Sequence, residues 1–148
     1  MNATTPREGA SKGILAVTLR EIESELPNGL HDAKITAISR DFDAESVDVH
    51  LKVLVGLPED EPARRSEFRQ GLLRFKGAKI VIVEEPDVES PFASAGSVNF
   101  VLTEDKAGSI ADELLKKLQG EYHTYTFFVQ EWFSNLRIAA TGLEFTWD

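Results

Sequence analysis

The sequence contains no cysteine. This absence excludes disulfides, thiolate metal sites and cysteine nucleophilic catalysis. Long apolar runs are missing too. Residues 14–17 form the one apolar run near the N-terminus, shorter than the roughly 7 to 15 apolar residues of a signal peptide. No stretch approaches the roughly 20 apolar residues that cross a bilayer. We therefore expect a cytoplasmic protein that is neither exported nor bound to a membrane.

Basic residues are few relative to acidic ones, 16 against 25, which gives a formal net charge of −9. Such a balance repels phosphate backbones, so nucleic acid is a poor partner. An acidic surface attracts a basic protein or a cation, although net charge serves solubility first. With 148 residues, the chain has the length of one domain. We expect a disordered tail over residues 1–13 and a single globular domain over residues 14–148.

Motifs that identify a chemistry are also absent. No serine lies in a GxSxG elbow, and residues 71–77 lack the pattern of a phosphate-binding loop. Glu84 and Glu85 are adjacent carboxylates, but neighbouring strand residues face opposite ways, whereas a glycosidase pair lies roughly 5 to 9.5 Å apart across a cleft. We therefore assign no catalytic residue, no metal and no cofactor, and we leave enzyme activity open while favouring its absence.

Two segments predict helices. Apolar residues recur at helical spacing over residues 18–26, where Thr18 and Glu21 form a capping box. The PNG sequence at residues 27–29 should end this helix in a turn. The second helix is expected over residues 109–120, between an N-capping serine and a C-terminal glycine.

Strand periodicity recurs along the rest of the chain, over residues 33–38, 47–55, 72–75, 78–84, 98–102, 122–129, 136–141 and 143–147. The clearest strand is 47–55, where valine and leucine alternate with polar residues, and residues 43–46 connect it to the preceding strand as a hairpin. Residues 80–83 form a continuous apolar run suited to a central strand. Between residues 56 and 71 we expect an acidic, exposed excursion, in which residues 63–70 form a short helix that starts near Pro62.

About seven strands at hairpin spacing, with one or two inserted helices, predict an α+β domain that is mainly antiparallel β. Its sheet should curl into a sandwich or a partial barrel. A doubly wound parallel sheet would need a helix between nearly every pair of strands, and this alternation is absent. In the last strand, Leu143, Phe145 and Trp147 should share one face.

The three histidines do not have the spacing of a metal site. No two of them are separated by the three or four residues typical of helical ligand pairs. His31 and Asp32 are adjacent, and we interpret them as the end of the turn after Gly29, with Asp32 accepting backbone N–H bonds.

Aromatic residues are concentrated between Tyr122 and Trp132. Such a stretch lines a ligand cavity in some curled sheets, but more often it belongs to the core. Trp132 falls at a predicted turn, so we expect it to be the most exposed of these aromatics and the first candidate for an interface.

Three segments carry a resemblance: LPNGLHDAKI at residues 26–35, the strand ending in VGLP at residues 49–58, and FFVQEW at residues 127–132. Together they resemble an uncharacterised family of small bacterial proteins over most of the chain from Leu26 onward. The HDA segment and its strand are also similar to some immunity proteins of bacterial polymorphic-toxin systems, small cytoplasmic domains that bind and silence a toxin. This second likeness covers the first hairpin and carries no catalytic residue. It implies protein binding.

Two functions of different classes compete. The first is a non-catalytic protein-binding domain whose acidic face meets a basic partner. The second is a small-ligand-binding protein or enzyme that uses the interior or mouth of the curled sheet. Exposed strand edges also allow a homodimer. We favour protein binding, and the candidate partner-binding or ligand-binding residues are His31, Asp32, Glu59, Asp60, Glu61 and Trp132.

Overall fold

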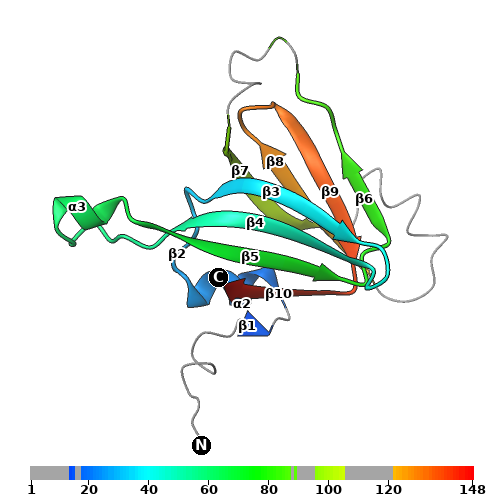
Figure 1. Cartoon of the computed structure of the whole chain (residues 1–148), viewed down its shortest axis with the longest axis horizontal. Helices are drawn as coiled ribbons and strands as arrows, with labels where there is room; N and C mark the ends of the chain where they lie inside the picture. Colours follow the sequence, from blue (N-terminus) through cyan, green and yellow to red (C-terminus); the bar gives the residue numbers. More distant parts are fainter. Residues whose placement is uncertain (1–13, 16–17, 88, 90–95, 106–121) are drawn as a thin grey trace, which may run out of the picture.

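The computed structural model describes residues 14–15, 18–87, 89, 96–105 and 122–148. Within these ranges, antiparallel strands form one curled sheet that is left open, as a partial barrel (Figure 1). The predicted fold class, α+β and mainly antiparallel β, is therefore confirmed. The helix predicted over residues 109–120 and the tail predicted over residues 1–13 lie outside the described residues.

The described elements are β1 (Ile14–Leu15), α2 (Leu19–Glu25), β2 (Pro27–Leu30), β3 (Lys34–Asp41), β4 (Ser46–Leu54), α3 (Pro62–Arg65), β5 (Phe68–Lys76), β6 (Ile80–Val83), β7 (Val98–Asp105), β8 (His123–Val129), β9 (Ser134–Ala140) and β10 (Gly142–Trp147). The order of strands across the sheet is β1-β10-β5-β4-β3-β7-β8-β9-β6, and each strand is antiparallel to its neighbours. The two ends of this order, β1 and β6, are not paired with each other in the described part of the chain.

The predicted N-terminal helix is confirmed as α2. The hydroxyl of Thr18 accepts the backbone N–H of Glu21 at 3.2 Å and lies 3.3 Å from the carboxylate of the same residue. These bonds satisfy a backbone donor that the first turn of a helix leaves without an intrahelical partner. Leu19 and Ile22 are the buried residues of α2, so its apolar stripe packs on the sheet.

Residues 27–30 form the short strand β2, where the sequence predicted a turn over residues 27–29. A turn-like hydrogen bond from the N–H of Gly29 to the carbonyl of Leu26 remains, and Gly29 has a φ of +56° that glycine adopts without strain. The side-chain amide of Asn28 donates to the carbonyls of Leu54 and Gly56 at 3.0 and 2.9 Å. This amide ties β2 to the end of β4.

The segment from Gly56 to Gly71 contains less helix and more strand than predicted. Helix α3 covers only Pro62–Arg65, and β5 begins at Phe68 rather than at Leu72. The reason is tertiary: β4 is long enough to pair with β5 over eight residue pairs, as far as Leu54 opposite Phe68. These pairs give hydrogen-bond partners to the backbone of residues 68–71, for which the local sequence predicts no strand.

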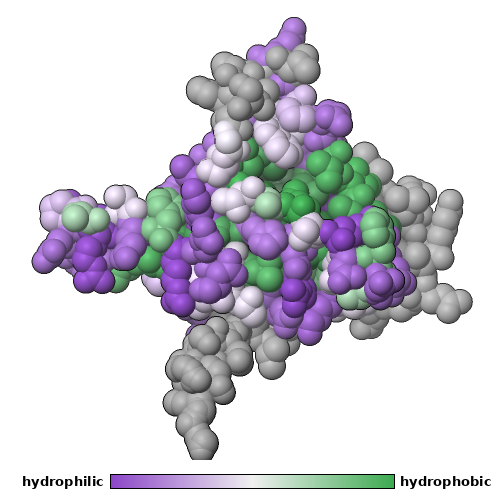
Figure 2. Space-filling view, viewed as in Figure 1, coloured by the Kyte–Doolittle hydropathy of each residue, from purple (hydrophilic) through white to green (hydrophobic). Residues whose placement is uncertain are grey.

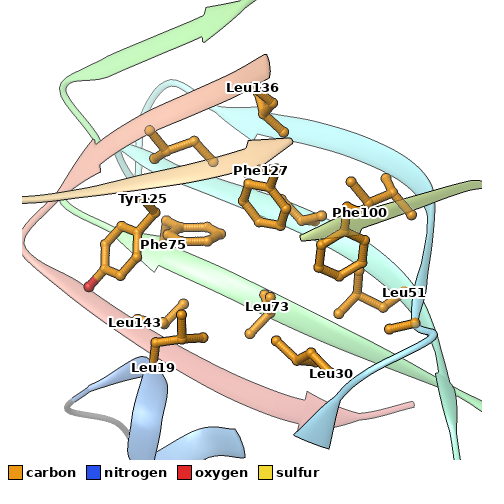
Figure 3. Close-up of a cluster of buried hydrophobic side chains, with 14 of the residues drawn as sticks. Leu19, Leu30, Leu51, Leu73, Phe75, Phe100, Tyr125, Phe127, Leu136 and Leu143 are labelled. Carbon is orange, nitrogen blue, oxygen red and sulfur yellow. The ribbon is translucent and has the colours of Figure 1, made fainter. Parts of the chain in front are cut away.

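The core lies inside the curl, between β4–β5–β10 on one side and β7–β8–β9 on the other (Figure 3). Phe75 of β5 packs edge-on against Tyr125 and Phe127 of β8, with ring centroids 5.0 and 5.8 Å apart. Phe100 of β7 extends this contact, 5.3 Å from Phe127. Burial raises the pKa of Tyr125 to about 12, so its phenol remains neutral within the core.

Strand β6 corrects one prediction. Its continuous apolar run, residues 80–83, indicated a central strand, yet β6 stands at the end of the strand order and pairs with β9 alone in the described part of the chain. Val83 is 51% exposed. The carboxylate of Glu84, just after β6, accepts the N–H of Asn135 at 2.8 Å and a guanidinium N–H of Arg137 at 2.7 Å. These bonds fasten the end of this edge strand to β9.

Replacing Phe127 with alanine is expected to lower the free energy of unfolding by about 3–5 kcal/mol, because it removes a fully buried ring and leaves a cavity. The matched control is Phe133→Ala, which truncates a ring that is 68% exposed and should cost less than about 1 kcal/mol. Urea denaturation followed by circular dichroism measures both. Equal losses for the two variants would contradict the assigned core.

The hydrogen bonds from Arg137 and Asn135 lower the pKa of Glu84 from its ordinary value of 4.5. A lowered pKa in the folded state contributes stability that is present above the ordinary value and is lost as the pH falls through the folded value. We therefore expect Glu84→Gln to be less stable than the wild type at pH 7, with the difference shrinking below about pH 4.5. Urea denaturation across this pH range measures it, and a constant difference would refute the interaction.

Candidate functional site

A groove of about 290 Å³ lies between α2, the turn that joins β2 to β3, and strand β7. Its floor consists of Leu30, Ala33 and Phe100, which are at most 6% exposed and belong to the core. Figure 3 shows Leu30 and Phe100 within the cluster of buried hydrophobic side chains. The groove therefore has an apolar, immobile base, because its floor is part of the packed interior.

One wall of the groove carries His31 and Asp32, in the turn after β2. The backbone N–H of His31 donates to the carbonyl of Asn28 at 3.1 Å, and Asp32 has a φ of +60°. A positive φ is tolerated better by aspartate or asparagine than by most residues. The ring nitrogen Nδ1 of His31 lies 3.0 Å from Oδ2 of Asp32, and the two side chains are 81% and 61% exposed. This pair lies at the turn, as the sequence indicated, and faces solvent.

Glu23 of α2 adds a second carboxylate to the groove. Its side chain is exposed, one helical turn after the buried Leu19. Sequence reasoning did not select Glu23, because an exposed glutamate on an amphipathic helix is normally solvated. Only the position of β2 against α2 brings it to the same groove as Asp32.

Asn99 and Gln130 form a neutral wall of the groove. The carboxylate of Glu131 accepts the backbone N–H of Asn99 at 2.7 Å and its side-chain amide at 2.8 Å. The N–H of Gln130 in turn donates to the carbonyl of Asn99 at 3.0 Å. These bonds hold the start of β7 against the β8–β9 turn and fix the orientation of the Asn99 amide.

Glu59, Asp60 and Glu61 do not join this groove. They lie at the tip of an arm, residues 54–68, that leads from β4 through α3 to β5 and projects from the body of the molecule (Figure 1). Glu59 and Glu61 are exposed. Asp60 is partly buried, and its carboxylate accepts the N–H of Leu57 at 2.8 Å, so it shapes the turn before α3.

The aromatic that the β8–β9 turn exposes is Phe133, which follows directly after the segment from Tyr122 to Trp132. Trp132 lies in the β8–β9 turn, as predicted, but its side chain is partly buried against the core. Phe133, one residue later, has a φ of +51° and is 68% exposed. The reversal of chain direction at this turn points one aromatic inward and its neighbour outward, which periodicity does not predict at a turn.

Hydrophilic residues dominate the surface of the arm and of the outer face of β3–β5 (Figure 2). On that outer face the guanidinium of Arg74 makes two bonds to Asp48, at 2.8 and 2.9 Å. The hydrogen bond to Asp48 raises the pKa of Arg74. Glu144 lies 3.9 Å from Arg74 and 3.3 Å from the ammonium of Lys76. In this row of charged side chains, which we call the ladder around Arg74, acidic and basic groups are paired with one another. The ladder is best explained as cross-strand stabilisation of the sheet.

The lining of the groove shows which functional groups it brings together. Its described lining contains one imidazole and two carboxylates but no hydroxyl, so the His31–Asp32 pair has no adjacent nucleophile there. In the described ranges, no three histidine or acidic side chains are grouped as metal ligands.

None of the described helices is both long enough and apolar enough to cross a membrane. Comparisons with protein-family models, with curated proteins and with solved structures give no match.

Replacing Glu131 with alanine should lower the free energy of unfolding by about 1–3 kcal/mol, because it leaves the partly buried N–H of Asn99 without its acceptor. The neighbouring change Gln130→Ala truncates an exposed side chain and should stay within about 0.5 kcal/mol of the wild type. Urea denaturation measures both. If Glu131→Ala were as stable as Gln130→Ala, Glu131 would not be the anchor of this wall.

Proposed function

We propose that this protein is a non-catalytic protein-binding domain that uses the exposed arm to contact a basic partner. One observation carries the proposal: residues 61–70 are exposed without interruption, although they form regular structure in α3 and β5. A chain segment that is folded, projecting and uncovered by its own domain is well suited to contact another protein.

The arm is held in place by its own hydrogen bonds. The N–H groups of Val55 and Gly56 donate to the carbonyl of Glu67 at 2.9 and 3.2 Å, and the guanidinium of Arg65 donates to the carbonyl of Asp60 at 2.9 Å. A side chain at Gly56 would overlap the carbonyls of α3, so this glycine permits the close packing of the tip. Such preorganisation lowers the entropic cost of binding.

The charge of the arm supports a basic partner. Residues 54–68 contain four acidic and two basic residues, a net charge of −2, and the whole chain carries −9. Arg64 lies 3.9 Å from Glu67, and in the described part of the chain Glu59 and Glu61 make no ion pair. Carboxylates without a partner in the free protein are available to steer and orient a cationic surface.

The packed interior counts against a ligand inside the curl. Phe75, Tyr125 and Phe127 are at most 1% exposed and touch one another across the sheet. The alternative of a small-ligand-binding protein or enzyme therefore remains a prediction for the open groove, and a homodimer remains a prediction for the strand edges. The likeness to immunity proteins supports protein binding, with a toxin as one class of partner.

The test is capture from a lysate of the native host, followed by titration of the purified partner. Wild-type chain should retain a basic protein, and Glu59→Lys combined with Glu61→Lys should weaken binding at least about tenfold by reversing both tip charges. The affinity of the wild type should also fall as salt is added, since these charges are exposed and therefore screened.

The matched control combines Glu25→Lys with Asp43→Lys, which makes the same charge change at exposed positions outside the arm and the groove. It should bind the partner like the wild type. The proposal fails if the wild type retains no protein, if only copies of the chain itself are retained, or if the two double variants bind alike.

A further inference from the structure

We propose that the groove between α2, the β2–β3 turn and β7 binds an arginine side chain of the partner. This inference rests on the proposed protein-binding function, because the arginine belongs to the protein partner. The groove is a second binding surface, separate from the arm, and it includes His31 and Asp32. The occupant follows from three properties of the groove: its apolar floor, the sign of its charge, and its hydrogen-bond acceptors.

The floor suits the stem of a long basic side chain. Leu30 and Phe100 are almost completely buried below the groove, while Val101 on its rim is 51% exposed. Arginine and lysine carry three or four methylene groups that pack on apolar surface while the charged end stays near water. A groove of about 290 Å³ that opens to solvent accommodates one such side chain.

The walls select a cation. Glu23 and Asp32 approach the groove from two different elements, and its described lining contains no lysine or arginine. Asp32 lies 3.0 Å from Nδ1 of His31, and both side chains remain largely exposed to solvent. Glu23 makes no ion pair in the described part of the chain, so the groove carries more acidic than basic charge. The ladder around Arg74 differs, because each acidic side chain there faces a basic one.

The acceptors favour a guanidinium over an ammonium ion. Glu131 holds the amide nitrogen of Asn99, so the amide oxygen of Asn99 remains as an acceptor on the neutral wall. With the carboxylates of Glu23 and Asp32, the lining then offers acceptors from α2, from the β2–β3 turn and from β7. A guanidinium presents five N–H donors in a plane and can bond to several of these acceptors at once, whereas an ammonium is a compact point charge.

The test is a titration of the ¹⁵N-labelled full chain, followed by NMR, with a blocked glycyl-arginyl-glycine tripeptide. Saturable shifts are expected at the backbone amides of Asn99, Val101 and Gln130. The same peptide with citrulline, which keeps the shape of arginine without its charge, should bind at least about tenfold more weakly. Equal binding of the two peptides, or the absence of saturable shifts at the groove, overturns the proposal.

Glu23→Gln combined with Asp32→Asn removes both charges without changing side-chain size, and asparagine suits the positive φ at position 32. This variant should bind the arginine peptide at least about tenfold more weakly. The control, Glu25→Gln with Asp43→Asn, makes the same charge change outside the groove and should bind within about twofold. Equal affinities for the two variants also overturn the proposal.

The two proposals fail separately. The peptide titration needs no natural partner, so an empty groove would leave binding through the arm intact. Conversely, a chain that captures no protein but binds arginine specifically in the groove would refute the proposed function while retaining an arginine site.

Discussion

The structure depends on one contact across the curl, the packing of Phe75 against Tyr125 and Phe127. Backbone pairing alone barely joins the two halves of the sheet, since β3 and β7 share only two residue pairs, whereas β4 and β5 share eight. Burial of aromatic rings contributes far more than two ladder pairs can. The described sheet therefore curls because its inner face is apolar, and it stays open because packing, rather than pairing, holds its halves together.

The packing of the core limits the surfaces to which a ligand or a partner can bind. A core filled by aromatic rings uses the interior that a lipocalin-like barrel leaves to a ligand. The available surfaces are then the places where the chain leaves the sheet: the arm between β4 and β5, and the groove where α2 and the β2–β3 turn meet β7. Both surfaces are braced by local bonds, through Asp60 in the arm and Glu131 beside the groove. Each also contains more acidic than basic side chains.

The candidate site shows how far sequence reasoning reaches. The PNG sequence before His31 and Asp32 predicts that this pair lies at a turn. The run of charges at residues 59–61 predicts an exposed acidic tip. Glu23, Asn99 and Glu131 carried no such signal, since each looks like an ordinary polar residue until helix, turn and strand are placed together. Trp132 is partly buried and the neighbouring Phe133 is exposed, because side-chain direction at a turn depends on φ, not on alternation.

The sequence by itself determined the elements whose signal is local. Alternation of valine with polar residues specified β4, the Thr18 cap specified the start of α2, and the face shared by Leu143 and Phe145 specified β10. Tertiary structure decided the rest. The apolar run of β6 is compatible with a central or an edge strand, because local hydrophobicity does not encode the number of neighbours. The length of β5 and the meeting of Glu23 with Asp32 likewise depend on partners distant in the chain, whose contacts no local pattern contains.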